Sequence, residues 1–190
     1  TYVQREYARD NPGGFAGYGG DCWGITASDG PGPGRRRVAG VPRRFWHYRA
    51  RGVPNGPDDG TISPWSLVAS LPFAPELVIP SIEAVLARYP GVRQAYGFTC
   101  SFNPTWTAAR GAAGGWVSPV HYAINQGPAA LMIENFRSEL VWRLLRGSPY
   151  VVEGLRRAGF QGGWLTVDPE ARAGPRRPLA ARRVTPVPSP

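Results

Sequence analysis

Residues 11–66 restrict the fold of this chain more than any other part of the sequence. Glycine, proline, aspartate and serine are dense there, and the apolar residues follow neither a helical nor a strand period. Ordered loops of this length usually serve a function or link domains. Aromatic residues recur at Phe15, Tyr18, Trp23, Phe45, Trp46, Tyr48 and Trp65. Disordered linkers have few aromatic residues, so we expect an ordered but irregular region.

Helical patterns lie on both sides of this region. Residues 1–10 resemble the last turns of a helix, and the Asn-Pro-Gly-Gly that follows is a stop signal. Further helices are expected from Pro75 to the Pro90-Gly91 pair, over residues 127–146 and over residues 149–160. No strand alternation is long enough for a sheet core. The sequence therefore predicts an all-α domain whose loops gather on one face.

The two ends of the chain differ in composition. Residues 1–165 contain the helical patterns and are expected to form one folded domain. Residues 166–190 are rich in proline and arginine with few large apolar side chains, which is typical of a disordered tail. No apolar run approaches the roughly 18 residues that a membrane-spanning helix needs. We therefore expect no membrane span.

The net charge of +9 comes entirely from arginine, because the sequence has no lysine. With so many Gly, Ala and Pro residues, this pattern indicates a high-GC coding bias. Nucleic-acid binding is the alternative, but the arginines form scattered groups, so no nucleic-acid partner is expected. Two cysteines, Cys22 and Cys100, can pair or remain buried thiols. Two histidines give no metal-binding spacing, so neither a metal nor another cofactor is expected.

Residues 19–34 combine the groups that a sugar ring requires. Trp23 can offer a flat apolar face, Thr26 and Ser28 offer hydroxyls, and Asp29 can accept charge-assisted hydrogen bonds. The same residues also suit a simple turn, in which Asp29 bonds to nearby backbone and Trp23 lies in the core. Spacing alone leaves both interpretations open and favours the turn.

Other polar residues have the same double interpretation. Residues 58–64, Asp-Asp-Gly-Thr-Ile-Ser-Pro, are interpreted first as a turn, because carboxylates adjacent along a chain usually point apart. Glu76 lies in the first turn of a predicted helix, where it can interact with the helix dipole. Asn125 and Gln126 precede the strongest helix and can cap it or contact a ligand. Glu134 lies among apolar neighbours, where a carboxylate is usually paired.

Five segments, taken together, resemble a known family. They are NPGGFAGYGGDCWGITASDGP, DDGTISP, SLPFAPE, YGFTCSFNP and INQGPAALMIENFRSELVW, in the family's order. The chain from Tyr2 to Phe160 resembles the C-terminal part of the glucoamylase-like domain family. That family is similar to the β-1,2-glucanases of glycoside hydrolase family 144 and, more distantly, to the transglycosylating domain of cyclic β-1,2-glucan synthases.

The resemblance implies an (α/α)6 toroid with a substrate cleft on its loop face, of which this chain is the C-terminal part. It implies hydrolysis of β-1,2-linked glucose polymers by two carboxylic acids and water, without a metal, in a periplasmic or secreted protein. An essential glutamate of the family, the expected general acid, lies in the half that this chain does not contain. The expected partner is an oligosaccharide or polysaccharide.

The resemblance also suggests residue roles. The residues implied to line the cleft are Trp23, Thr26, Ser28 and Asp29. The residues implied to lie next to the cleft are Thr61 and Glu76, and those at its base are Gln126 and Glu134. Asp29, Glu76 and Glu134 are the carboxylates implied to act in the chemistry. Two positions depart from the family, which commonly has carboxylates where this chain has Cys100 and Asn125. A thiol or an amide cannot replace a carboxylate in proton transfer, although Asn125 can bind a sugar hydroxyl.

The sequence therefore predicts a glycoside hydrolase acting on β-1,2-glucan or a related β-glucan. This chain is expected to supply its C-terminal, cleft-forming portion, which can be inactive on its own. Three alternatives stay open: a transglycosylase of the cyclic-glucan type, a non-catalytic carbohydrate-binding remnant, and an arginine-rich nucleic-acid binder. Cys100 and Asn125 favour the remnant.

Overall fold

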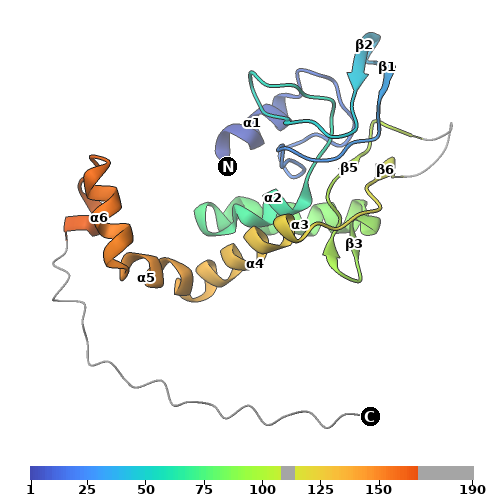
Figure 1. Ribbon diagram of the computed structural model, residues 1–190. Helices are drawn as coiled ribbons and strands as arrows, with labels where there is room; N and C mark the ends of the chain where they lie inside the picture. The colour runs from blue at the N-terminus through green and yellow to red at the C-terminus, as the bar shows by residue number, and fades with distance from the viewer. Residues whose placement is uncertain (108–113, 167–190) are drawn as a thin grey trace, which may run out of the picture. The chain divides into compact units, whose positions relative to one another are not determined.

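The computed structural model describes residues 1–107 and 114–166 (Figure 1). The chain divides into two compact units, Thr1–Leu140 and Val141–Pro190. Almost all of the tail expected at 166–190 lies outside the described residues. Within the described ranges, no helix has the length and apolar character needed to cross a membrane.

The first unit combines helices with short antiparallel strand pairs. Its helices are α1 (Tyr2–Asp10), α2 (Pro64–Ala69), α3 (Pro75–Arg88) and α4 (Ala123–Ser138), with short 3-10 turns at Leu71–Phe73 and Pro90–Val92. Its strands are β1 (Gly34–Val38), β2 (Val41–Phe45), β3 (Arg93–Gln94), β4 (Gly97–Phe98), β5 (Phe102–Asn103) and β6 (Trp116–Val117). They pair as β1 with β2, β3 with β4 and β5 with β6.

The second unit is helical over the residues that the structure describes. Helix α5 (Leu140–Arg146) begins at its boundary, and α6 (Pro149–Arg157) and a 3-10 turn (Gly163–Thr166) follow. Helix α6 agrees with the helix predicted over residues 149–160.

The expectation of an all-α domain is not confirmed, because the first unit contains three two-stranded sheets. The longest of them, the β1–β2 hairpin, falls in the region that was expected to be irregular. Ala39 and Gly40 connect its strands with φ angles of 47° and 79°. Two positive φ angles are typical of a type I′ hairpin turn, which usually shows itself through Asn-Gly or Asp-Gly. Alanine at the first position, between arginine-rich strands, hides this signal.

The predicted helices are otherwise present, with one difference in extent. Helices α1 and α3 begin and end close to the expected residues. Helix α4 begins earlier, at Ala123, and contains Pro128 near its start. Glu139 then takes a left-handed conformation with a φ of 54°, which separates α4 from α5 where one continuous helix was expected.

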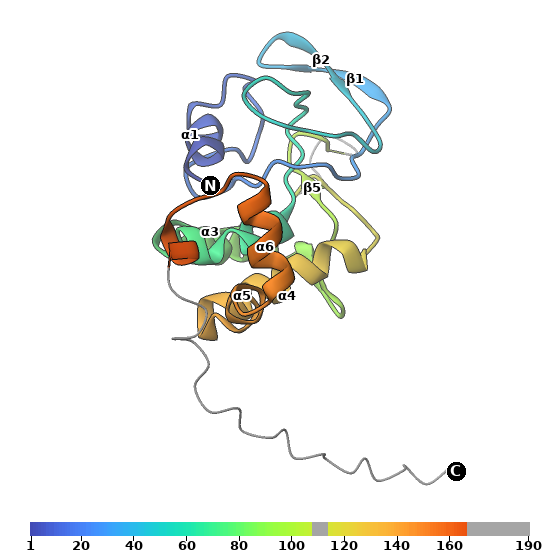
Figure 2. The same cartoon turned by 60° about the vertical axis from the view of Figure 1, so that its left-hand side comes forward.

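The core of the first unit lies between its loops and its helices. Helix α2 packs against both α3 and α4, and the hairpin lies at the opposite end of the unit from these helices (Figures 1 and 2). The main buried cluster consists of Ala8, Cys22, Trp23, Ile62, Leu67, Leu71, Val78, Val85, Val92 and Phe102. A second cluster of Phe15, Val38 and Phe45 lies at the hairpin. Both cysteines are buried free thiols.

Candidate functional site

Segments that are far apart in the sequence enclose a pocket of about 340 Å³ in the first unit. The lining residues are Thr26, Ala27, Ser28, Asp29, Tyr48, Trp65, Cys100, Tyr122, Ile124 and Asn125. Aromatic side chains thus face hydroxyl, amide and carboxylate groups across one cavity. Such a mixture of apolar walls and a few polar groups is typical of small-molecule sites.

Of the lining residues that the structure describes, Asp29 alone carries a carboxylate. The hydroxyl of Tyr122 donates a hydrogen bond to Asp29 Oδ2 at 2.9 Å. The hydroxyl of Ser101 donates to the backbone carbonyl of Asp29 at 2.7 Å. The first bond orients the carboxylate, and the second fixes the backbone of the residue that carries it. The pocket therefore contains one oriented acidic group beside a phenol.

The bond to Asp29 also changes the ionisation of Tyr122. The hydrogen bond and the negative charge of Asp29 both raise the pKa of the Tyr122 phenol, because each disfavours the phenolate. Tyr122 therefore stays protonated, as a hydrogen-bond donor, to a higher pH than a free tyrosine.

Replacing Asp29 with asparagine should bring the pKa of Tyr122 down towards its ordinary value of about 10. NMR titration of tyrosine ring-labelled protein measures this directly. Tyr2 is the matched control, because its hydroxyl donates to Glu76 Oε1 at 2.6 Å and its pKa is raised for the same reason. The pKa of Tyr2 should respond to Glu76→Gln and not to Asp29→Asn. An unchanged Tyr122 pKa in the Asp29 variant would contradict the pairing.

A buried ion pair connects the loop of Ser28 with the loops of Trp46 and Thr61. Arg51 and Asp59 are both fully buried, and their two hydrogen bonds, from Nε to Oδ1 and from Nη2 to Oδ2, are each 2.7 Å long. Arg51 Nη1 also donates to the backbone carbonyl of Ser28 at 2.6 Å. The carboxylate of Asp59 accepts from the backbone N–H of Trp46 at 3.2 Å and that of Thr61 at 3.2 Å. The pair thus positions the loop that carries Ser28 and Asp29.

The turn predicted over residues 58–64 is confirmed. The two carboxylates point to different partners, since Asp58 accepts from the hydroxyls of Tyr7 and Tyr18 while Asp59 binds Arg51. Each carboxylate also accepts a backbone N–H two residues further along the chain. The paired-carboxylate chemistry considered for this segment therefore has no geometric basis.

Four of the residues proposed from the sequence meet in the pocket: Thr26, Ser28, Asp29 and Asn125. Thr26, Ser28 and Asp29 come from one loop, and Asn125 comes from the first turn of α4. Cys100 lines the same pocket. Cys100 and Asn125, the two positions expected to depart from the family pattern, are therefore both located at the candidate site.

Two predicted sugar contacts are wrong. Trp23 has no exposed surface and donates from its indole Nε1 to Ser81 Oγ at 3.1 Å, so its ring belongs to the core. The alternative interpretation of Trp23 as a core residue is the correct one. Thr61 is also fully buried, and its hydroxyl accepts from the Asn103 amide at 3.0 Å. Neither side chain can touch a ligand in the pocket.

The other predicted residues are placed outside the pocket lining. Glu76 is exposed on α3, and the bond from Tyr2 lowers its pKa. Glu134 accepts from the Ser138 hydroxyl at 2.5 Å on α4. The Gln126 amide donates to the backbone carbonyl of Phe98 at 2.6 Å. Their local partners favour structural roles over contact with a pocket ligand.

Sequence reasoning missed the aromatic walls of the pocket, which are Tyr48, Trp65 and Tyr122. Tyr48 and Trp65 belong to the aromatic residues that marked the irregular region. The sequence did not show that these two line a pocket. The indole N–H of Trp65 is buried and has no hydrogen-bond acceptor among the described residues. A donor of this kind at a pocket wall can be satisfied by a bound hydroxyl or by water.

No group of three or more metal-ligating side chains is present within residues 1–107 and 114–166. The arrangement of the pocket instead suits hydrogen bonding and ring stacking. Its one carboxylate can accept sugar hydroxyls or take part in proton transfer.

Known proteins resemble this chain in sequence and in fold. A family model described as "Putative glucoamylase" matches residues 1–149. The chain belongs to this family. The exo beta-1,2-glucooligosaccharide sophorohydrolase (non-reducing end) of Parabacteroides distasonis is 32% identical over 156 residues, which are 82% of this chain and 19% of that protein.

Solved structures of the glucoamylase family and its relatives resemble the chain in fold. A Bacteroides uniformis protein with the same family description shares 36% identity, with a TM-score of 0.67, over 86% of this chain and 34% of its own. An endo-beta-1,2-glucanase from Chitinophaga pinensis, solved with sophorotriose and glucose, shares 31% identity, with a TM-score of 0.66 and the same coverage. The chain therefore spans about a fifth to a third of the length of these relatives.

Proposed function

We propose that this chain forms part of a glycoside hydrolase that acts on β-1,2-glucan or a related β-glucan. The observation that carries the proposal is the pocket, in which Asp29 lies among aromatic walls and hydroxyl and amide groups. Sugar rings need apolar plates for their C–H faces and planar polar groups for their hydroxyls. The β-1,2-glucan-acting relatives support the choice of substrate.

The wider architecture is part of the same proposal. The helices of the first unit and the likeness to glucanase structures support a portion of an (α/α)6 toroid. The chain would supply the C-terminal wall of the cleft, in a periplasmic or secreted protein. Partial coverage of the relatives makes the activity of the whole protein a proposal as well.

Within this proposal, Asp29 is the catalytic carboxylate that this chain contributes. Tyr122 holds it through the 2.9 Å hydrogen bond, and the Arg51–Asp59 pair fixes the loop that carries it. Hydrolysis of a glycosidic bond requires one carboxyl to protonate the leaving oxygen and another group to activate water or attack carbon. Glu76 and Glu134 lie outside the pocket lining, so within this proposal the second group comes from another part of the whole protein.

A non-catalytic carbohydrate-binding role is the second candidate. Cys100 and Asn125 both line the pocket, and neither can move a proton as a carboxylate does. Such a pocket would hold a saccharide through its aromatic walls and hydrogen bonds without cleaving it. Binding without release of reducing ends would distinguish this role from hydrolysis.

The test uses the whole protein of which this chain is proposed to be a part, and β-1,2-glucooligosaccharides as ligands. Calorimetric titration measures binding, and reducing-end release measures hydrolysis. Asp29→Asn should lower the rate of hydrolysis by about 10²–10⁴-fold, because general acid–base catalysis contributes on that order. Binding should change much less, since an amide still accepts hydrogen bonds. Glu134→Gln is the matched control and should keep both properties.

Each outcome decides between the candidates. Hydrolysis that falls in the Asp29 variant supports the hydrolase. Saccharide binding with no hydrolysis by the unchanged protein supports the binding role. Absence of both, or hydrolysis that depends on Glu134 and not on Asp29, overturns the proposed site.

A further inference from the structure

Residues 30–57 contain seven arginines and no acidic residue. The β1–β2 hairpin lies within this segment and sets arginines directly opposite one another. Arg35 faces Arg44 across the two strands, and Arg36 faces Arg43. Like charges placed opposite each other in a sheet are destabilising. The two pairs lie on opposite faces, because side chains alternate along a strand.

The pair on the inner face contacts aromatic rings of the protein, although Arg43 Nε is buried without a hydrogen-bond acceptor among the described residues. The guanidinium of Arg36 lies 3.8 Å from the centre of the Trp106 ring and donates to the carbonyl of Thr107. Arg43 lies 5.8 Å from the centre of the Phe15 ring. Aromatic faces and carbonyl oxygens stabilise a cation without an acidic partner. These two arginines therefore have a structural role.

The outer face has no comparable support. Arg35, Arg37 and Arg44 are exposed, and none has a carboxylate partner among the described residues. Arg37 donates to the carbonyl of Gly40 at 2.7 Å, which leaves its charge uncompensated. The repulsion between Arg35 and Arg44 is thus present in the unliganded hairpin. A bound anion would reduce this repulsion between the two guanidinium groups. The arginine face (Arg35, Arg37 and Arg44) should therefore favour binding of an anion.

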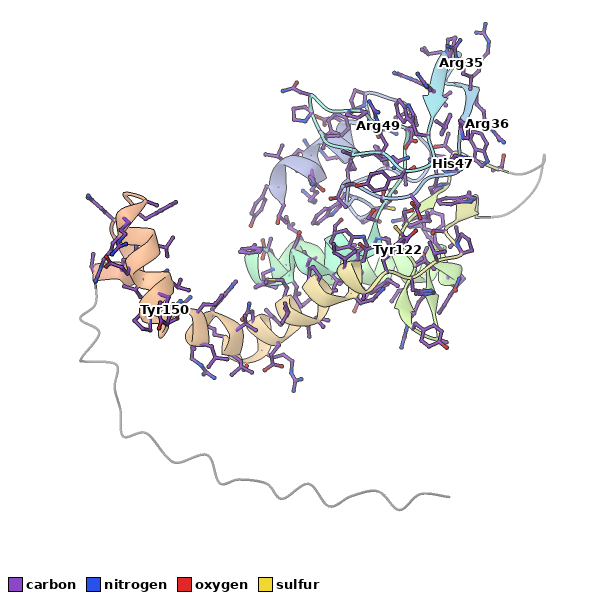
Figure 3. The ribbon with its side chains drawn as sticks, viewed as in Figure 1. Arg35, Arg36, His47, Arg49, Tyr122 and Tyr150 are labelled. Carbon is purple, nitrogen blue, oxygen red and sulfur yellow. The ribbon has the colours of Figure 1, made fainter. Side chains whose placement is uncertain are left out.

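The chain continues from this hairpin directly into the pocket wall. After β2 ends at Phe45, Tyr48 lines the pocket. Arg49 follows, is exposed, and forms two backbone hydrogen bonds with Ser28, another lining residue. In the view of Figure 3, His47 lies between the hairpin arginines and Tyr122. The backbone therefore leads from the end of the hairpin to the pocket within three residues, and Arg49 adds a positive charge directly after Tyr48.

We propose that the arginine face, with Arg49 at the pocket rim, binds anionic groups carried by a saccharide chain whose neutral rings occupy the pocket. The anionic group is a phosphate or a carboxylate, which arginine binds through charge-assisted and often paired hydrogen bonds. The inference rests on the proposed function for the neutral part of the ligand. Continuity with the pocket favours an acidic saccharide over a nucleic acid or a lipid surface.

The test compares phosphorylated β-1,2-glucan with the unmodified glucan of the same length. The unchanged protein should bind the phosphorylated form about tenfold more tightly at low ionic strength, and salt should reduce this difference by screening exposed charges. The variant Arg35→Gln/Arg37→Gln/Arg44→Gln should lose the preference and keep its affinity for the neutral glucan. Its melting temperature at low salt should be unchanged or higher, because the repulsion is gone.

A second triple variant, Arg137→Gln/Arg156→Gln/Arg157→Gln, removes the same number of charges elsewhere and should keep the preference. The inference would be overturned if both triple variants lost the preference for phosphorylated glucan equally. It would also be overturned if the hairpin variant kept this preference. Tighter arginine-dependent binding to single-stranded nucleic acid or to anionic vesicles would also overturn it. If the unchanged protein binds phosphorylated glucan through these arginines but ignores neutral glucan, the anion site stands and the proposed function fails.

Discussion

Replacing Trp23 with alanine should destabilise the first unit by about 3–5 kcal/mol, the usual cost of removing a large buried aromatic side chain. Trp23 has no exposed surface, packs in the main core cluster and donates to Ser81. The substitution leaves a cavity and removes the hydrogen bond that Ser81 Oγ accepts, although this hydroxyl still donates to the Leu77 carbonyl at 2.7 Å. Denaturant unfolding followed by tryptophan fluorescence or circular dichroism measures the change in free energy.

Tyr48→Ala is the matched control for Trp23→Ala. Tyr48 lines the pocket and is 65% exposed, so its loss should change the free energy of unfolding by no more than about 0.5 kcal/mol. It should weaken saccharide binding instead. Trp23→Ala should have the opposite profile, with affinity preserved for each folded molecule. A stable Trp23 variant with lost saccharide affinity would restore the stacking role that the structure contradicts.

Asp59→Asn should destabilise the protein by about 3–5 kcal/mol, because it leaves the Arg51 guanidinium buried without its counter-charge. Both side chains are fully buried, and the arginine has no route to water without moving the loops that it binds. Since one of those loops carries Ser28 and Asp29, saccharide binding should fall in the same variant. Chemical unfolding and calorimetric titration measure the two effects.

Asp21→Asn provides a control with the same chemistry at the surface. Arg88 and Asp21 form an ion pair of the same length, 2.7 Å, but their side chains are 43% and 55% exposed. Exposed pairs contribute only about 0.2–1 kcal/mol, because water screens them and both partners can be solvated separately. Similar losses in the two variants would show that burial does not control the contribution of Asp59.

The helices could be predicted from the sequence because their signals are local. Pro75 starts α3 and Pro90-Gly91 follows its end, while Asn11 takes the left-handed conformation that ends α1. The hairpin could not be predicted in the same way. Its turn uses Ala39 in place of the usual asparagine or glycine, and its inward arginines are stabilised by Trp106 and Phe15, which are distant in the sequence.

The kinds of side chain at the candidate site could be predicted from the sequence. The exact set of residues that line the pocket could not. Thr26, Ser28, Asp29 and Asn125 were identified as sugar-binding residues and lie together in the pocket. Trp23 and Thr61 have the same residue types as Trp65 and Thr26, which line the pocket, and only tertiary packing removes them from the surface. The Arg51–Asp59 anchor joins two loop residues without any periodic signal, so composition and spacing could not reveal it.

The bond between Tyr122 and Asp29 joins residues that are 93 positions apart. The pocket is therefore absent from any partly folded form in which these two ends of the first unit have not met. A ligand that occupies the pocket would bind the native state alone, and mass action then raises the apparent melting temperature as the ligand concentration rises. The ligand would therefore stabilise the folded protein against unfolding, and more strongly at higher ligand concentrations.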